Sequence, residues 1–389
     1  MLIENSLISA DSINSSFLLD EPTHYSLNGA TPILEIIEQQ AIRPPGGDHY
    51  IGDFYSAISA LTRGGNNRIV DLLQQVYEIR PMTPEHHTNL LFRAVQAKFM
   101  KEPGYPNRYT TSQKWIQLLM DLVNDEEMFE TVRETLLTKD TTTTVYQRYA
   151  GERALMAAIT RGKPTRAVDL GCGGNYGLPG MSIGEQFKPI NDNTHNHTLN
   201  RLLSDPFLLE EGLAIDREDP YNLDAINWRH SCGLYPTELE SGGFQEVLAL
   251  EKRLSIDKAV RFYQGDLLIL PIGNELSEAN YDFVSINTML YQLQSELQVK
   301  VIQNARKLLK PNGKLFIQDF AFKDTSNLTK LCFEGVEWGI KGNYRLFATG
   351  ASSDDEMFEV FKWNNGRCRQ VAEGEDFQRF FSSIGYNSN

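Results

Sequence analysis

Several features that would define other classes of protein are missing from this sequence of 389 residues. No run approaches the roughly 18 consecutive apolar residues that a membrane-spanning helix requires. No run of basic residues is present, and 37 Lys and Arg against 51 Asp and Glu give a net charge of −14. A field of that sign repels nucleic-acid phosphates and anionic lipid. We therefore expect neither nucleic acid nor a membrane as a partner.

Cysteines are too few and too dispersed for a disulfide framework or a zinc site. The four are Cys172, Cys232, Cys332 and Cys368, with no C-x-x-C pair among them. This spacing favours reduced thiols and predicts no metal. The first 17 residues contain two acids and no basic residue, which is unlike a secretory signal. We expect a soluble, cytoplasmic protein.

The chain divides into two parts with different apolar patterns. From Thr31 to Ile159, apolar residues recur at the three- and four-residue spacings of helices, between turns rich in glycine and proline. After Pro164, short apolar runs alternate with helical stretches, which is typical of a parallel sheet covered by helices. We predict a helical N-terminal domain, residues 1–145, and an α/β domain, residues 146–389.

The predicted strands of the second part follow one another at regular intervals. They cover residues 166–171, 212–216, 260–266, 281–287 and 314–320, with a helix at 295–310. Three further runs, at 343–350, 356–363 and 366–374, predict that the sheet ends in antiparallel strands joined by turns.

A glycine-rich turn follows the first of these strands and is the most informative segment. Residues 167–177 read AVDLGCGGNYG. Glycine allows positive φ angles and lets a ligand lie directly on the backbone, and open α/β sheets bind ligands at this edge. The segment lacks the Gly-Lys-Ser/Thr of a phosphate-binding loop, and Tyr176 stands where a dinucleotide fingerprint has its third glycine. A glycine turn alone could equally be a tight connection between a strand and a helix.

Two acids follow the next two predicted strands. Asp216 comes after GLAI and Asp266 after FYQG. A carboxylate at the second strand can accept both hydrogen bonds of a ribose diol, and one at the third can accept from an exocyclic amine such as that of adenine. Either acid alone could be a solvated strand end or a helix cap, but the two in register reinforce each other.

In these motifs the chain resembles the class I S-adenosylmethionine-dependent methyltransferases. VDLGCGG is similar to the first motif of that family, and YQGDLLILP, YDFVSINTMLYQL and ARKLLKPNGKLFIQDF are similar to its later ones, in order, between Ala150 and Asp376. The resemblance implies a Rossmann-like, doubly wound, mostly parallel seven-stranded sheet and S-adenosyl-L-methionine as the cofactor.

The resemblance also implies roles for individual residues. Asp169, Gly171, Cys172 and Gly173 would lie at the methionine end of the cofactor, and Asp216 would hold the ribose. Asp266 and Leu267 would hold and flank the adenine, Asn287 and Met289 would lie beside the sulfonium, and Tyr291 and Gln292 would face the substrate.

The sequence departs from the family pattern in two insertions, near residues 178–211 and 224–243. The first separates Gly171 from Asp216 by 45 positions, where about 20 is usual. Either Asp216 follows a long loop or helix, or the ribose acid lies elsewhere; we favour Asp216 because GLAID has strand character. Together with the helical domain, the insertions could cover the site and exclude water.

The methyl group of a sulfonium is already activated, so the main task is to hold a nucleophile in line with it. A general base is needed only for an acceptor that is protonated at neutral pH. Our candidates are Tyr291, His195 and His230, with His197 as a further one. His195 and His197 form an H-x-H pair, but their polar surroundings favour a solvated loop over a metal site.

Three functions follow from this pattern. The first is methylation of a small molecule in a covered pocket, which the acidic charge and absence of nucleic-acid motifs favour. The second is methylation of a protein, with the helical domain recognising the partner. The third is a catalytically inactive, cofactor-binding regulatory protein.

Overall fold

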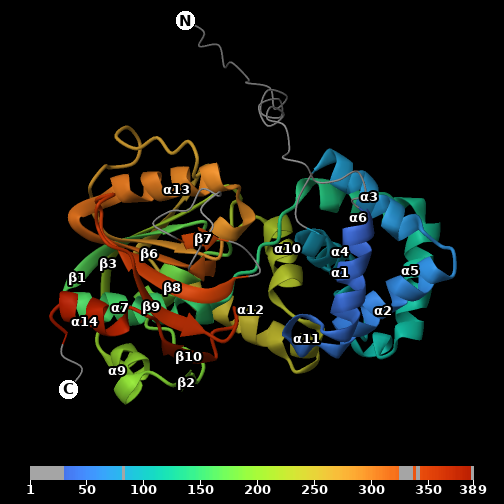
Figure 1. Ribbon diagram of the computed structural model, residues 1–389, viewed down its shortest axis with the longest axis horizontal. Coiled ribbons are helices and arrows are strands. Elements are labelled where there is room, and N and C mark those ends of the chain that lie inside the picture. Colours follow the sequence, from blue (N-terminus) through green and yellow to red (C-terminus); the bar gives the residue numbers. More distant parts are fainter. Residues whose placement is uncertain (1–29, 81–83, 324–335, 339–341, 387–389) are drawn as a thin grey trace, which may run out of the picture. The chain divides into compact units, whose positions relative to one another are not determined.

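The computed structural model describes residues 30–80, 84–323, 336–338 and 342–386. They group into two compact units (Figure 1). One comprises the residues up to Phe92 and Tyr109–Lys139, and the other comprises Arg93–Arg108 and everything from Asp140 onward. The division therefore falls six residues before the predicted boundary at 145. Residues 93–108 belong with the sheet because the side chains of Arg93 and Gln96 donate hydrogen bonds to the carbonyls of Ser231 and Leu234, at 2.7–3.1 Å.

The helical unit forms where the sequence has apolar residues at helical spacing. Its helices are α1 (Ala30–Ile42), α2 (His49–Arg63), α3 (Arg68–Ile79), the first part of α4 (Pro84–Phe99), α5 (Ser112–Asn124) and α6 (Glu126–Thr138). The carboxylate of Asp48 accepts the N–H groups of Tyr50 and Ile51 and so begins α2. The rings of Phe92 and Trp115 pack edge-on against Phe54, with centroids 5.1 and 5.3 Å away.

Within the described residues, the second unit is built on one sheet of ten strands in the order β2-β10-β9-β8-β6-β5-β1-β3-β4, with β7 also paired to β6. Seven of these strands are longer than four residues: β1 (Pro164–Leu170), β3 (Leu208–Asp216), β4 (Val260–Gln264), β5 (Tyr281–Asn287), β6 (Leu309–Lys323), β8 (Asn343–Thr349) and β9 (Phe358–Trp363). The other three are short: β2 (Asn191–Asp192), β7 (Val336–Trp338) and β10 (Gln370–Glu373).

The strand directions confirm the predicted α/β class with a mostly parallel sheet. Strands β4, β3, β1, β5 and β6 run parallel in that spatial order. β8 and β9 then continue as antiparallel neighbours, as the tail of the sequence predicts. β10 pairs antiparallel with β9 and falls within the predicted run 366–374. The count exceeds the predicted seven because β10 at the far edge and the two- and three-residue strands β2 and β7, too short to give an alternating pattern, also pair into the sheet.

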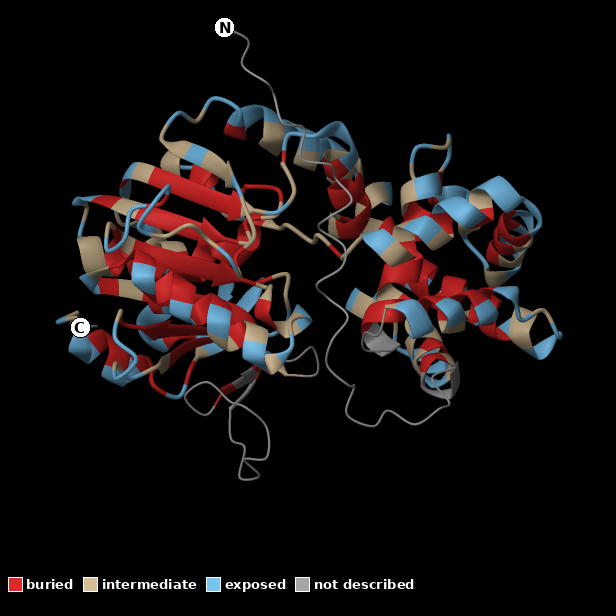
Figure 2. Cartoon of the chain, turned by 90° about the horizontal axis from the view of Figure 1, so that it is seen from above, coloured by how far each residue is buried: buried red, intermediate tan, exposed pale blue. Residues whose placement is uncertain are grey.

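Helices cover both faces of the sheet. Successive strand residues point to opposite faces, so Ala167 and Phe283 pack in one core with α7 (Ala150–Thr160), α9 (Thr198–Ser204) and α14 (Phe377–Ser383). Val168 and Val284 pack in a second core with α13 (Ser295–Leu308). Figure 2 shows the strands as buried, with exposed residues along the outer faces of the helices.

The two insertions occupy the connections around β3. Residues 178–211 form most of α8 (Gly177–Ser182), then β2, α9 and the start of β3, and residues 224–243 form α10 (Leu223–Gly233) and α11 (Pro236–Glu240), ahead of α12 (Gly243–Leu254). Despite the long first insertion, β3 lies parallel to β1, with Ile215 opposite Leu170. Asp216 therefore ends the strand next to the glycine turn. Within the described residues, no helix has the length and apolarity needed to cross a bilayer.

Candidate functional site

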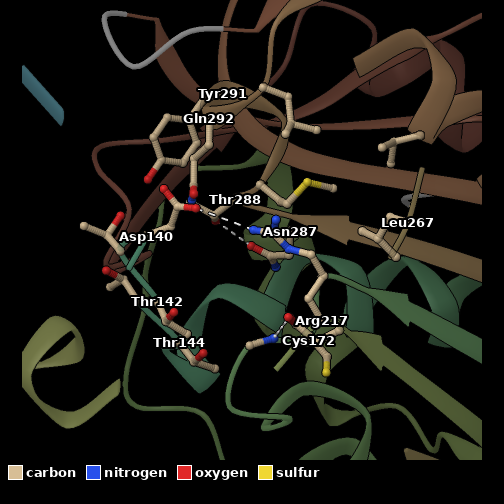
Figure 3. Close-up of a pocket in the computed structure, with 18 of the residues that line it drawn as sticks. Asp140, Thr142, Thr144, Cys172, Arg217, Leu267, Asn287, Thr288, Tyr291 and Gln292 are labelled. Atoms are coloured by element: carbon tan, nitrogen blue, oxygen red, sulfur yellow. Dashed lines mark hydrogen bonds and ion pairs between the residues drawn. The ribbon is translucent and has the colours of Figure 1, made fainter. Parts of the chain in front are cut away.

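A pocket opens at the carboxyl ends of the parallel strands. Its floor is the turn after β1, and its sides come from the ends of β3, β4 and β5 and from the segment that precedes α7 (Figure 3). The lining residues are Asp140, Thr141, Thr142, Thr143, Thr144, Val145, Arg148, Tyr149, Gly171, Cys172, Gly173, Asp216, Arg217, Asp266, Leu267, Leu268, Asn287, Thr288, Met289, Tyr291, Gln292, Leu293 and Val301.

The glycine turn can form only because it has no side chains at two positions. Gly171 and Gly173 have φ angles of 73° and 54°, which other residues rarely adopt. A Cβ on Gly173 would lie 2.4 Å from Oγ1 of Thr144, and one on Gly171 would lie 3.2 Å from Cγ of Met289. The backbone of the turn is thus presented directly to the pocket.

Asp216 lies at the end of β3 and faces this turn. Its Oδ2 accepts the N–H of Gly173 at 2.8 Å, and its Oδ1 accepts the N–H of Glu218 at 3.3 Å. Burial raises the pKa of Asp216, whereas these N–H groups lower it. The carboxylate therefore both shapes the turn and lines the pocket as an acceptor.

Asp266 and Leu267 line the pocket beyond β4. Oδ1 of Asp266 accepts the N–H of Leu268 at 2.8 Å. The side chain of Asn304 donates to the carbonyl of Leu267 at 2.9 Å and so fixes this loop against α13. Asp216 and Asp266 thus stand at the ends of adjacent strands, as predicted.

Asp169 lies behind the pocket and does not line it. It is fully buried, and its Oδ2 accepts the hydroxyl of Tyr149 at 2.9 Å, while Oδ1 has no hydrogen-bond partner among the described residues. Burial raises the pKa of Asp169 to about 7. Tyr149, its hydrogen-bond partner, does line the pocket, and the contact of Asp169 with the cofactor stays a prediction.

A second buried carboxylate, Glu152, was missed by sequence reasoning. It accepts hydrogen bonds from Ser285 and, at 3.2 Å, from Nδ2 of Asn287. Burial raises its pKa to about 8. Tyr149 and Glu152 are three residues apart at the start of α7 and so share a helix face, but in the sequence that spacing is indistinguishable from core packing.

The loop after β5 is held by a carboxylate of the next strand. Oδ2 of Asp319, in β6, accepts the N–H groups of Met289, Leu290 and Tyr291 at 2.9, 2.7 and 3.3 Å. Its Oδ1 accepts the N–H of Phe320 at 2.7 Å. These bonds orient Met289 and Tyr291 toward the pocket, and sequence reasoning did not find Asp319.

One wall consists of the segment Asp140–Val145, four of whose residues are threonines. Thr144 accepts the N–H of Gly174 at 2.7 Å, and the carbonyl of Asp140 accepts Nε1 of Trp228 at 2.7 Å. Asp140 also pairs with Arg217 at 3.5 Å. Figure 3 shows Asp140, Thr142 and Thr144 along this wall, with Tyr291 and Gln292 beyond one end and Arg217 and Cys172 near the other.

Two predicted catalytic histidines lie elsewhere. Neither His195 nor His230 is among the described residues that line the pocket. The N–H of His195 bonds Glu373 at 2.7 Å, beside β10, because the insertion around it runs to the far edge of the sheet. His230 is buried in α10, with Nε2 3.0 Å from Glu251. Only Tyr291, of the three candidates, lines the pocket.

The insertions do not line the pocket either. No described lining residue comes from 178–211 or 224–243. The covering that we expected from them is supplied by the segment before α7, which the sequence assigns to the helical domain. No group of three or more potential metal-ligating side chains occurs in the described part of the chain.

No protein-family model matches the sequence, and no curated protein matches it. Solved structures that match include an S-adenosylmethionine-dependent methyltransferase from Mesorhizobium loti (15% identity, TM-score 0.23, covering 44% of this chain and 54% of that one). Another is a SAM-dependent methyltransferase from Aquifex aeolicus (16% identity, TM-score 0.25, covering 46% of this chain and 69% of that one). A third is PKMT2 from Rickettsia typhi in complex with AdoHcy (15% identity, TM-score 0.26, covering 45% of this chain and 26% of that one).

This chain spans about half the length of the first matched structures. At these low identities and TM-scores, neither an activity nor a substrate follows from the names. The doubly wound α/β fold is defined by the strand order and pairing described above.

Proposed function

We propose that this chain is a class I S-adenosylmethionine-dependent methyltransferase that acts on a small molecule. One observation carries the proposal: a bare glycine turn and two carboxylates, Asp216 and Asp266, border one pocket at the ends of three adjacent parallel strands. Backbone without side chains suits a ligand that lies flat on it, and the carboxylates suit a ribose diol and an exocyclic amine.

The lining residues fit the cofactor from end to end. Asp216 would hold the ribose, and Asp266 and Leu267 the adenine. Gly171 and Gly173 would support the methionyl part, and Met289, packed against Gly171, would lie beside the sulfonium. Asp169 would lie behind the positively charged end and would add negative charge there when ionised, since burial raises its pKa only to about 7. The unpartnered Oδ1 of buried Asp169 supports a cation at that end, because a buried polar atom without a partner destabilises the empty site.

The bound cofactor would supply an activated methyl group. The protein would then mainly have to position the acceptor. Alignment of a nucleophile about 3–3.5 Å from the methyl carbon lowers the activation barrier for methyl transfer by roughly 7–11 kcal/mol. Asp319 orients the loop that carries Tyr291, whose hydroxyl would bind the acceptor. Burial raises the pKa of Tyr291, so the hydroxyl keeps its proton and would act as a hydrogen-bond donor. The threonine wall would exclude water from the reacting atoms.

The same pocket would also suit a protein methyltransferase, with a side chain entering it, or an inactive cofactor-binding regulator. The polar wall, which offers hydroxyl groups to a compact polar ligand, favours a small molecule. A cytoplasmic location is part of the proposal, because the described Cys172, Cys232 and Cys368 are buried and unbridged.

Calorimetry with S-adenosylmethionine and S-adenosylhomocysteine tests the proposal. We expect binding in the micromolar range, weakened at least tenfold in Asp216→Ala. Asp224→Ala is the matched control, because Asp224 lies in the first turn of α10 and does not line the pocket. Failure of the wild-type chain to bind either compound would refute all three cofactor-dependent functions.

A further inference from the structure

Arg148 is a buried cation at one end of the pocket, and no carboxylate neutralises it among the described residues. Its side chain lines the pocket although the residue is only 8% exposed. Nε donates to the carbonyl of Gly366 at 2.9 Å, and Nη1 donates to the carbonyl of Thr143 at 2.6 Å. No ion pair or Nη2 hydrogen bond is formed within the described ranges. A buried charge without a counter-charge is costly.

The strand order places Arg148 beyond the reacting end of the proposed cofactor. Asp266 follows β4 and Asn287 ends β5, three strand spacings or about 14 Å further along the sheet edge. The guanidinium of Arg148 lies 5.9 Å from the ring of Tyr344 in β8, two spacings beyond β5. The cofactor would therefore occupy the side of Asp216 and Asp266, and Arg148 would face what lies past the methyl group.

Asp319, which anchors the loop that carries Tyr291, forms no ion pair with Arg148 within the described residues. Both oxygens of Asp319 already accept backbone N–H groups, three on Oδ2 and one on Oδ1. Other polar side chains at this end of the pocket are those of Tyr291, Thr141 and Gln292, which carry donors that an anion can use.

We propose that Arg148 binds a carboxylate of the methyl acceptor, so that the substrates are small carboxylic acids. A guanidinium presents planar, paired donors that match a carboxylate, and one cation balances one negative charge. The inference rests on the proposed function, because the position of the cofactor defines which end receives the acceptor. A carboxylate could also come from the methionyl part of the cofactor, and the experiment separates the two sources.

The test measures binding of benzoate and its neutral analogue benzamide to the full chain saturated with S-adenosylhomocysteine, by ligand-observed NMR at constant ionic strength. We expect wild type to bind benzoate at least tenfold more tightly than benzamide. In Arg148→Gln the ratio falls to about one, while the affinity for S-adenosylhomocysteine stays within threefold.

Arg153→Gln is the matched control. Arg153 also lies at the start of α7, donates to two carbonyls and packs over an aromatic ring, Phe207, but it does not line this pocket. We expect it to retain the benzoate preference. If Arg148→Gln does not fold, the wild-type ratio and Arg148→Lys, which keeps the charge, decide the matter.

Equal binding of benzoate and benzamide by the wild type, or binding of neither, would overturn the inference. A tenfold loss of S-adenosylhomocysteine affinity in Arg148→Gln would also overturn it, because the cation would then serve the cofactor. Failure of the proposed function is distinguishable, since the wild type would then not bind S-adenosylhomocysteine at all.

Discussion

The hydroxyl of Thr144 accepts the backbone N–H of Gly174 at 2.7 Å. This bond ties the wall that precedes α7 to the glycine turn after β1, over an interval of 30 residues. This hydrogen bond connects the wall of the pocket to its floor, so we expect a substitution in one segment to displace the other.

Replacement of Gly173 by alanine tests this connection. Its Cβ would lie 2.4 Å from Oγ1 of Thr144, so we expect the wall to be displaced and the affinity for S-adenosylhomocysteine to fall at least tenfold by calorimetry. Gly184→Ala is the control, because Gly184 has a similar positive φ of 70° with open space around it. Both variants carry the backbone cost of about 1–2 kcal/mol, so an equal loss of affinity in both would contradict the steric account.

Tyr291→Phe removes only the hydroxyl that faces the acceptor end. The ring contact with Phe320, at 5.4 Å between centroids, should persist. We expect S-adenosylhomocysteine affinity within threefold of wild type, with weaker binding of benzoate to the complex. A loss of cofactor affinity larger than the loss of benzoate affinity would mean that Tyr291 serves the cofactor.

The buried carboxylate of Glu152 makes stability depend on pH. Burial raises its pKa from 4.5 to about 8, although hydrogen bonds from Ser285 and Asn287 lower it. The folded chain thus retains a proton that the unfolded chain releases. The stability this provides is fully present below about pH 4.5 and is lost as the pH rises to about 8.

Urea unfolding of wild type and Glu152→Gln at pH 5, 6, 7 and 8 measures this effect. We expect the free energy of unfolding of wild type, relative to the variant, to fall with pH by at most about 1.4 kcal/mol per unit. The glutamine keeps an acceptor for Ser285, so the variant should fold. A difference that is constant with pH, or that grows, would show that Glu152 is ionised throughout.

Asp319→Asn replaces an oxygen that accepts three N–H groups. In the amide, one of the two acceptor atoms becomes a donor that faces backbone donors. We expect a loss of about 2–4 kcal/mol in the free energy of unfolding, measured in urea, and weaker benzoate binding because the loop carrying Tyr291 loses its anchor. The exposed Asp354→Asn should change stability by less than about 0.5 kcal/mol. Similar stability of the two variants would refute the anchoring role.

The sequence predicts those parts of the fold that depend on local patterns. The strands that contain Val168, Leu213 and Val284 were recognised because continuous apolar runs are typical of strands buried on both faces. Asp216 and Asp266 were found because each directly follows such a run. Of the three short strands, β10 falls within the predicted run 366–374, whereas β2 and β7 were not predicted, since two or three residues carry no period.

The acceptor end of the pocket could not be predicted in the same way. Arg148, Glu152 and Asp319 acquire their roles from partners far away in the chain, such as Gly366 for Arg148 and Asn287 for Glu152. His195 and His230 were chosen for their chemistry alone, and the path of the chain takes both away from the pocket. Residue type indicates which chemistry a side chain can perform, but the tertiary structure determines which groups it contacts.

The carbonyl of Gly366 that holds Arg148 belongs to the connection between β9 and β10, in the last twenty-five residues of the chain. The proposed site for the adenosyl group, by contrast, is formed by residues between 171 and 268. If both proposals hold, the acceptor and the adenosyl group would be bound by largely different segments of the sequence. Substitutions in the connection between β9 and β10 would then change which acids bind without altering the residues that contact the adenosyl group.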